Sequence, residues 1–274
     1  MSAAARALSD AAEAKLLGAE RRSDPRIAAD LRVEIFSQAF SGALAARTRD
    51  LSIGGACLAT PSPIAVGSIR AVTVAFPEAA VRLRAVGTWQ CCHPSLGTTL
   101  TGVRFDAVEP SAQDLLWEFV LEEGRQLARF FHFHTAIEGV GIDGAIGLAH
   151  VTRLCLPNAG EIVYRQRSGS SSSSIYVVQE GSIVLQMRVN AARTQDFAVL
   201  RRGDVFGGSL LPTHGDDEEL AVARSQARLL EIDERALAYL SLGTPWLAQA
   251  LTAAATGAYA HRLRGALRKR GASD

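Results

Sequence analysis

The chain has 274 residues, enough for two domains that each bury a core, and 48% of its residues are hydrophobic. It carries 29 Lys and Arg residues against 28 Asp and Glu residues, so its net charge of +1 argues against a general attraction to nucleic acid or anionic membranes. The four cysteines show no disulfide-framework spacing and fit a reducing cytosol.

Residues 1–20 are rich in alanine and carry charges throughout, so they do not resemble a signal peptide. No apolar run approaches the length that spans a bilayer. We therefore predict a cytoplasmic protein without a membrane span. An apolar stripe that includes Leu8 and Leu16 favours a helix over residues 1–20, and a frayed tail is the alternative.

Three arginines, Arg21, Arg22 and Arg26, lie just before the first strand-like run. Pro25 favours an extended or turning backbone between them rather than a helix. A guanidinium group pairs with two phosphate oxygens at once, stacks on flat rings and matches the O6/N7 edge of guanine. Such an arm suits a ligand that carries phosphates and guanines. The alternative is a solvated cluster that contributes little.

Residues 27–105 contain short runs of alternating apolar and polar residues that predict about six β-strands. One junction between two runs contains Asp50, Ser52, Gly54 and Gly55. The two polar side chains can cap a turn or accept hydrogen bonds, and the two glycines permit positive φ and close backbone approach. This pattern predicts a strand, a tight turn and a further strand within a small closed barrel.

The two motifs in this order, Arg-x-x-x-Arg from Arg22 to Arg26 and Asp-x-Ser-x-x-Gly from Asp50 to Gly55, resemble those of the PilZ domain. The resemblance covers about residues 21–120. It implies a six-stranded β-barrel over residues 21–110 that binds the bacterial messenger cyclic di-GMP, with no cofactor. The binding site that it implies consists of Arg21, Arg22, Arg26, Asp50, Ser52, Gly54 and Gly55.

Cys91, Cys92 and His93 stand in a row and suggest metal binding at first sight. Adjacent cysteines cannot easily both reach one tetrahedral ion, and no second Cys/His pair lies at a usual zinc spacing. We therefore predict no metal site.

Residues 111–140 are expected to link two domains. Apolar residues such as Phe119 and Phe130 recur at helical spacing and predict a helix over residues 111–134, with Ser111 as its N-cap. Four glycines between positions 139 and 147 then predict a flexible or turning junction.

Residues 141–235 return to short β runs that resemble a cyclic-nucleotide-binding domain of the catabolite activator type. The runs that carry this resemblance lie at residues 154–164, 175–181 and 200–207. It implies a β jelly-roll with glycine turns between strands. A serine-rich stretch at residues 168–174 predicts a flexible loop between two of the strands.

The resemblance does not extend to the residues that bind the nucleotide. In that family a Phe-Gly-Glu sequence supplies a glutamate that holds the ribose, whereas Gly208 follows Phe206 and Gly207 here. The arginine that holds the cyclic phosphate would fall near Asp217 and Glu218, within a run of four carboxylates that would repel a phosphate. We therefore expect this domain to have lost cyclic AMP binding.

Residues 236–274 are expected to form two helices, the second starting after Thr244 with Pro245 at its first position. In the activator family this long helix makes a homodimer. Its small-residue face would allow close helix approach and comprises Trp246, Ala250, Ala253, Ala254, Gly257 and Ala258. No helix-turn-helix pattern follows before Asp274, so we expect no DNA binding.

The predicted fold is mainly β with helices: a PilZ-type barrel, a helical linker, a jelly roll and C-terminal helices. We predict a non-enzymatic receptor that binds cyclic di-GMP and relays the signal to a protein partner through the second domain. No nucleophile–base–acid set or phosphate loop indicates an enzyme. The alternatives are a regulator that binds cyclic AMP, or both nucleotides, and a ligand-free scaffold.

Overall fold

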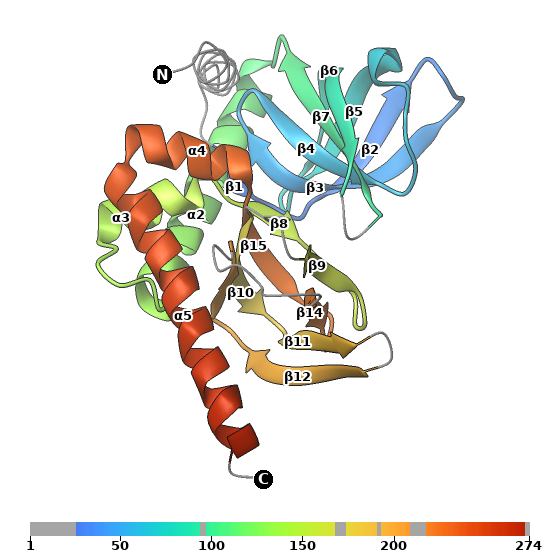
Figure 1. The fold of residues 1–274 in the computed structure, drawn as a ribbon. Helices are drawn as coiled ribbons and strands as arrows, with labels where there is room; N and C mark the ends of the chain where they lie inside the picture. Colours follow the sequence, from blue (N-terminus) through green and yellow to red (C-terminus); the bar gives the residue numbers. More distant parts are fainter. Residues whose placement is uncertain (1–25, 94–96, 168–173, 191–192, 209–217, 272–274) are drawn as a thin grey trace, which may run out of the picture.

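The structure is a computed structural model that describes residues 26–93, 97–167, 174–190, 193–208 and 218–271. An antiparallel barrel is followed by helices, by two four-stranded antiparallel sheets and by two C-terminal helices (Figure 1). This arrangement confirms the predicted fold class. The expected helix over residues 1–20, Arg21, Arg22 and residues 168–173 of the serine-rich loop lie outside the described part of the chain.

The barrel comprises six main strands and one short added strand. These are β1 (Ile27–Ala28), β2 (Arg32–Ser37), β3 (Ala43–Ser52), β4 (Gly55–Thr60), β5 (Ile69–Ala75), β6 (Ala80–Cys92) and β7 (Thr99–Asp106), with a 3-10 turn, η1 (Val66–Ser68), before β5. The strand order is β1-β3-β2-β5-β6-β7-β4, and pairing of β3 with β4 closes the barrel. In β2 the buried Val33 and Ile35 alternate with the exposed Arg32 and Glu34, as the sequence pattern predicted.

Helix α2 (Pro110–His134) follows the barrel and begins one residue earlier than expected. Its N-cap is Glu109 and not Ser111, so the predicted cap is wrong. Proline suits the first helical position because its φ is already helical and because it lacks an N–H that would need a partner there. The rigid ring therefore sets the start of the helix without a side-chain cap.

Helix α2 contacts both β-rich parts of the molecule. Near its middle, the ring of Phe119 packs edge-on against Phe76 of the barrel, with ring centroids 5.3 Å apart. Nearer its C-terminal end, the Arg202 guanidinium lies over the ring of Phe130, 5.0 Å from its centroid. The helix therefore connects the barrel to the sheets that follow.

The glycine-rich stretch after α2 turns at Gly139, where φ is +76°, as predicted, but it then forms a helix, α3 (Ile142–Ala149), so the prediction of a flexible or turning junction is wrong at Gly144 and Gly147. A Cβ added at Gly144 would lie 2.6 Å from the ring of Trp246, and one at Gly147 would lie 3.1 Å from Leu247. Both glycines therefore permit close packing of α3 against the last helix. This packing outweighs the low helix propensity of glycine.

The two four-stranded sheets face each other, and we call them together the roll. Its strands are β8 (Arg153–Cys155), β9 (Ile162–Arg167), β10 (Ile175–Glu180), β11 (Ile183–Asn190), β12 (Arg193–Leu200), β13 (Val205–Gly207), β14 (Glu218–Ala223) and β15 (Arg228–Ile232). One sheet has the order β13-β10-β15-β8 and the other β12-β11-β14-β9. In β10, Tyr176 and Val178 face the space between the sheets, whereas Ile175 and Val177 pack against the helices. This sheet is therefore buried on both faces.

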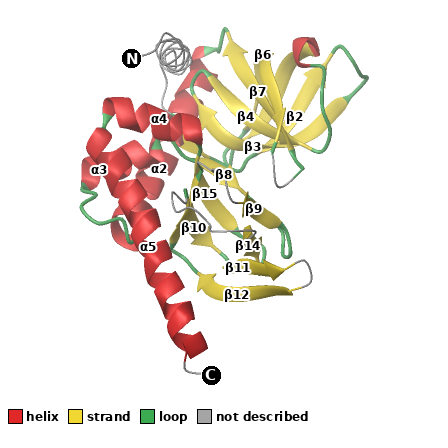
Figure 2. Cartoon of the chain, viewed as in Figure 1, coloured by secondary structure: helices red, strands yellow, loops and turns green. Residues whose placement is uncertain are grey.

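Two helices end the described chain: α4 (Glu234–Gly243) and α5 (Pro245–Gly271). The helices gather on one side of both the barrel and the roll (Figure 2). One continuous set of buried apolar side chains, from Ile27 in the barrel through Leu116 and Leu148 to Ile232 in the roll, joins these parts. None of the described helices is long and apolar enough to span a membrane.

Candidate ligand-binding site

The fold brings Arg26, the last residue of the arginine motif, into contact with the aspartate motif. Strand β1 pairs with β3, so that Ala28 lies opposite Asp50 and Ile27 opposite Leu51. Arg26 lies one residue before β1, and its Nη1 donates to Oδ1 of Asp50 at 2.8 Å. The arginine arm that leads to this point, with Arg21 and Arg22, lies outside the described residues.

The Asp50 carboxylate is buried and has several donors. It is 3% exposed, and the pairing of β3 with β4 is irregular between Thr48 and Asp50. Such a bulge re-aims side chains on the bent strand. Besides Arg26, Oδ1 accepts a hydrogen bond from the N–H of Cys57 at 3.1 Å. Oδ2 accepts one from Nε of Arg153, also at 3.1 Å.

Arg153 comes from the roll and not from the barrel. It opens strand β8, and its Nη2 also lies 3.2 Å from Oδ2 of Asp233, the N-cap residue of α4. Burial alone would lower the pKa of Arg153. The negative charges of Asp50 and Asp233 raise this pKa by more than burial lowers it, so the net pKa lies above the ordinary value. The side chain therefore stays charged and links the barrel motif to the start of α4.

The turn of the aspartate motif is held within the barrel. The hydroxyl of Ser52 donates to the carbonyl of Gly55 at 3.1 Å, and the carbonyl of Gly54 accepts from the N–H of Phe105 at 2.9 Å. A Cβ at Gly55 would lie 2.3 Å from the carbonyl oxygen of Val103. The φ of Gly55 is not positive, so of the two properties that glycine permits, this position uses close backbone approach.

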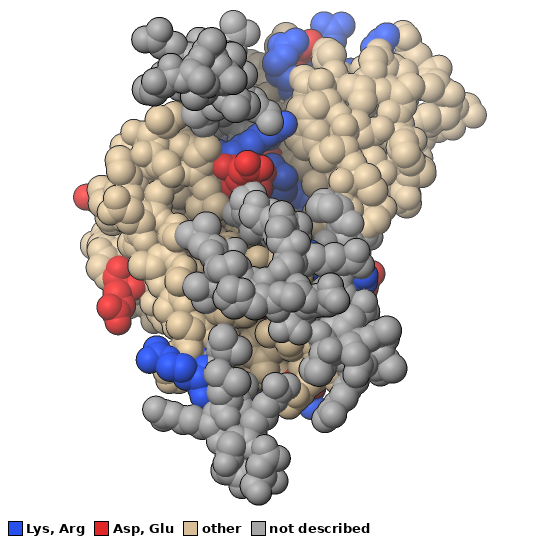
Figure 3. Space-filling view, viewed as in Figure 1, with Lys and Arg blue, Asp and Glu red and all other residues tan. Residues whose placement is uncertain are grey.

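An open pocket of about 460 Å³ lies on the outside of the barrel, and Arg49, the residue before Asp50, is part of its lining. Its lining includes Arg47, Arg49, Thr60 and Pro61. Burial lowers the pKa of Arg49, whose Nη1 lies 4.0 Å from Asp30. In the space-filling view, basic and acidic side chains gather where the barrel meets the helices (Figure 3). Arg47 and Arg49 give the lining of the pocket positive charge, which Asp30 partly offsets through its ion pair with Arg47 at 2.6 Å.

Of the seven predicted site residues, the structure brings Arg26 and Asp50 into direct contact and places Ser52, Gly54 and Gly55 in the adjoining turn. Ser52 is 2% exposed, and its hydroxyl is used within the turn. Sequence reasoning missed Arg153, which lies 103 residues from Asp50 in the chain. An arginine at the start of a short strand gives no local signal, because such residues are usually solvated.

A second contact joins the barrel to the roll. Nε2 of His93 lies 3.9 Å from Oε2 of Glu231, and the hydroxyl of Tyr176 donates to Oε1 of the same glutamate at 3.1 Å. Cys91 and Cys92 are exposed beside it. Within the described ranges, no group of three or more His, Cys, Asp or Glu residues is arranged to hold a metal ion. His93 therefore serves the contact between the barrel and the roll.

The space between the sheets of the roll is filled by the chain itself. Tyr164, Tyr176 and Phe206 stack with ring centroids 5.3–6.2 Å apart. Of the predicted acidic run, only Glu219 has a described side chain; it is buried and accepts hydrogen bonds from Tyr164 and Tyr259. This carboxylate points into the roll, so its contribution is to packing between the sheets and α5.

Glu219 should make stability depend on pH. Burial raises its pKa above the ordinary value of 4.5, although hydrogen bonds from Tyr164 and Tyr259 and the charge of Arg262 oppose the rise. The folded state therefore holds the proton more tightly, and its stability falls as pH rises from the unfolded pKa through the folded pKa. We expect urea unfolding at a series of pH values rising from 4.5, the ordinary pKa of the group, to show this decline.

The Glu219→Gln variant should lose that decline, because its amide does not titrate. Glu122→Gln is the matched control: the Glu122 side chain is exposed, and hydrogen bonds from Gln126 and Arg125 lower its pKa. This control should keep the wild-type slope. An unchanged slope in Glu219→Gln would show that another group controls the pH dependence.

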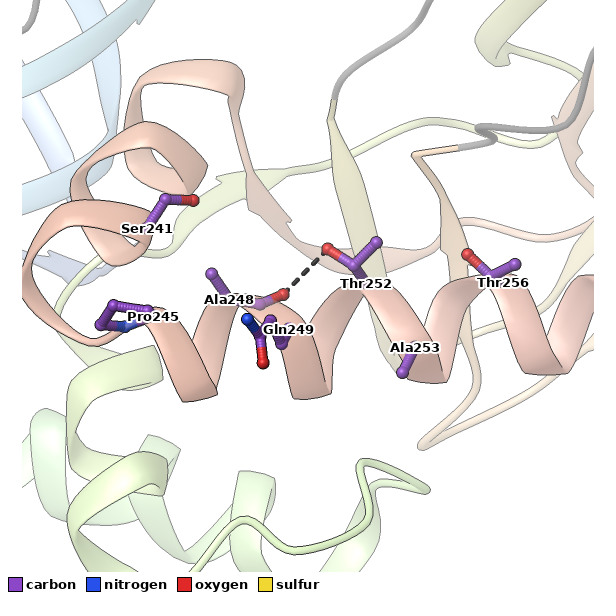
Figure 4. Close-up of a pocket in the computed structure, with 7 residues that line it drawn as sticks. All are labelled: Ser241, Pro245, Ala248, Gln249, Thr252, Ala253 and Thr256. Carbon is purple, nitrogen blue, oxygen red and sulfur yellow. Dashed lines mark hydrogen bonds between the residues drawn. The ribbon is translucent and has the colours of Figure 1, made fainter.

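A second pocket, of about 510 Å³, lies along α5 (Figure 4). Its lining includes Ser241, Pro245, Gln249, Thr252 and Ala253. Thr252 is tied to its own helix, because its hydroxyl donates to the carbonyl of Ala248 at 2.8 Å. The lining is therefore mostly small and uncharged.

The expected small-residue face of α5 is divided between two environments. Ala250 and Ala254 pack against the core of the same chain, whereas Ala253 and Gly257 are exposed. Near the end of the helix, Arg262 donates to the carbonyl of Val205 and to Asp204, both at 2.9 Å. Helix α5 is therefore anchored on the roll along one side and is open to solvent along the other.

The described chain is a closed antiparallel barrel, in which Arg26 of the arginine motif pairs with Asp50 of the aspartate motif, followed by the two-sheet roll. Residues 20–122 match the family model of the PilZ domain. The chain therefore contains a PilZ domain. No curated protein sequence matches the chain.

Solved structures are similar to parts of the chain. The inhibitor of motility MotI/DgrA of Bacillus subtilis is 19% identical over 39% of this chain and 51% of that chain, with a TM-score of 0.34. YcgR of Escherichia coli, in complex with c-di-GMP, is 21% identical over 39% of this chain and 47% of that chain, with a TM-score of 0.34. The catabolite activator protein of Thermus thermophilus is 23% identical over 49% of this chain and 61% of that chain, with a TM-score of 0.39. The chain thus spans less than two thirds of each of these proteins.

Proposed function

We propose that this protein is a non-catalytic receptor that binds cyclic di-GMP on its PilZ barrel. The observation that carries the proposal is the contact between the two motifs, in which Arg26 donates to Asp50 at 2.8 Å within a matched PilZ domain. The proposed site comprises Arg21, Arg22, Arg26, Asp50, Ser52, Gly54 and Gly55. Arg49, the residue before Asp50, lines the open pocket on the outside of the barrel and brings a further positive charge close to the motif in the chain.

The chemistry of these groups matches the messenger. Guanidinium groups pair with phosphate oxygens and with the O6/N7 edge of guanine, and they stack on the flat base. The Asp50 carboxylate accepts from N–H donors, which the opposite edge of a guanine supplies. In this proposal Arg26 leaves Asp50 for the ligand, and Arg21 and Arg22 close over it. Gly54 and Gly55 act by shaping the turn.

The proposal includes a relay of the signal through the roll to a protein partner. The ion pairs of Arg153 to Asp50 and Asp233 give the site a physical connection to α4. It also includes a homodimer through the exposed side of α5, where Ala253 and Gly257 offer a surface for close approach. Sedimentation velocity of the purified chain tests the dimer, and a monomer at all concentrations would contradict it.

Calorimetric titration of the full chain with cyclic di-GMP tests the receptor proposal. We expect the wild type to bind and Arg22→Ala to bind at least about tenfold more weakly, because each lost charge-assisted hydrogen bond costs about 1.5–3 kcal/mol. Arg70→Ala is the matched control. Arg70 is an exposed arginine of β5, a barrel strand that pairs with β2 and β6 and not with the strands that carry the motifs, and its Nη2 donates to the side chain of Gln38 at 2.7 Å. This control should bind as the wild type does.

A parallel titration with cyclic AMP separates the alternatives. Binding of cyclic di-GMP alone, weakened in Arg22→Ala, supports the receptor. Binding of cyclic AMP alone would favour a regulator of the activator type and contradict the proposal. Absence of binding with both nucleotides would leave a scaffold and contradict it as well.

A further inference from the structure

The Asp50 carboxylate is fully used in this structure. Oδ1 accepts from Arg26 and from the N–H of Cys57, and Oδ2 accepts from Arg153. The Asp50 side chain is 4% exposed, against 24% for Arg26 and 17% for Arg153. The two guanidinium groups therefore occupy the directions from which a ligand would approach the carboxylate.

A ligand with two adjacent N–H donors needs both oxygens of Asp50. The Cys57 N–H is fixed by the pairing of β3 with β4, so the two arginine side chains are the groups that can move away. Arg26 belongs to the arginine motif and can follow the ligand to its phosphates. Arg153 belongs to β8 of the roll and would be displaced from Asp50.

We propose that Arg153 is a determinant of messenger affinity that lies outside the PilZ domain, because it competes with the ligand for the Asp50 carboxylate. This inference rests on the receptor function proposed above. Arg153 stabilises the ligand-free state through its contact with Asp50 at 3.1 Å. A contact that exists only in the ligand-free state lowers the apparent affinity, so its removal raises that affinity.

The same competition couples the site to the roll. When Asp50 is taken by the ligand, Arg153 keeps only Asp233 at the N-cap of α4. The connection from barrel to roll then rests on other contacts, such as His93 with Glu231 and Arg228 with Asp30. By linkage, the messenger weakens the contact between Arg153 and Asp50 by the same free energy by which that contact weakens binding of the messenger.

Calorimetric titration of Arg153→Gln with cyclic di-GMP tests the inference. Glutamine removes the charge, while Asp50 keeps Arg26 and the Cys57 N–H as donors. We expect the Kd of Arg153→Gln to be lower than that of the wild type by at least about fivefold. Arg153→Lys keeps the charge without the fork of donors and should give an intermediate Kd. This second variant preserves the test if Arg153→Gln does not fold.

Arg228→Gln is the matched control. Arg228 also projects from the roll towards the barrel, but its Nη1 lies 3.8 Å from Asp30 and it makes no contact with Asp50. Its removal costs the interface one arginine and should leave the Kd of the messenger unchanged. Hydrogen exchange adds a second readout. The messenger should speed exchange at the start of β8 in the wild type and have no such effect in Arg153→Gln.

The outcomes separate the inference from the function on which it rests. If the wild type binds and both Arg153 variants bind equally well or more weakly, Arg153 does not compete and the inference is overturned. If Arg228→Gln tightens binding as much as Arg153→Gln does, a general loosening of the interface explains the gain and the inference is also overturned. If neither the wild type nor any variant binds, the receptor function itself fails.

Discussion

Replacing Asp50 with alanine is expected to lower the free energy of unfolding by about 3 kcal/mol or more and to abolish binding of cyclic di-GMP. The variant leaves Arg26 and Arg153 without their shared carboxylate, at a position where Asp50 is 3% exposed. Removing one partner of a buried ion pair is costly because the remaining charge stays out of water. Arg153 retains Asp233, which limits the loss.

Urea unfolding measures this effect, and Asp106→Ala is its matched control. Asp106 lies in the same barrel and pairs with Arg104, but both side chains are well exposed, at 38% and 61%. Exposed pairs contribute about 0–1 kcal/mol, so the control should be nearly as stable as the wild type. Equal losses in the two variants would show that the Asp50 ion pairs add no more than a surface pair.

Gly55→Ala is expected to destabilise the barrel by about 3 kcal/mol. The new Cβ would lie 2.3 Å from the carbonyl oxygen of Val103 and 3.3 Å from Cα of Arg104. Both are backbone atoms of β7, which pairs with β4 along the whole length of β4. A clash with backbone in a closed barrel cannot be relieved by a rotamer change, so the strands themselves must shift.

Thermal unfolding compares Gly55→Ala with Gly67→Ala, which lies in η1 and has no atom within 4 Å of the added Cβ. The control adds the same methyl group without a clash and should unfold near the wild-type temperature. A Gly55→Ala protein as stable as its control would mean that β4 and β7 can separate without cost. It would also mean that close packing against β7 does not require a glycine at position 55, the last position of the motif.

The fold class was predictable because the signals for it are local. Alternation such as that of Val33 and Ile35 identifies a half-buried strand. The contact between Arg26 and Asp50 was also within reach, because both residues belong to motifs that the sequence displays. The sequence left open whether Gly55 serves positive φ or close backbone approach, because both favour glycine.

The remaining features depend on residues far apart in the chain. Arg153 reaches Asp50 only because β8 of the roll lies beside β3 of the barrel, which no local pattern states. Helix α3 was missed because Gly144 reads as a helix breaker until Trp246 is known to lie against it. The start of α2 differed from the prediction because Pro110 competes with Ser111 as a start signal, and the proline prevails.

Helix α2 is a long rod that contacts the barrel and the roll at different points along its length. The PilZ match ends at residue 122, in the middle of this 25-residue helix, so the boundary of the family is not a boundary of the structure. At 1.5 Å per residue the helix is about 37 Å long, and a tilt of about 10° at one end displaces the other by about 6 Å. Phe119 seats it on the barrel and Phe130 meets Arg202 of the roll. Because these two contacts lie about 16 Å apart along the helix, a tilt of about 10° about the barrel contact would shift the roll contact by about 3 Å.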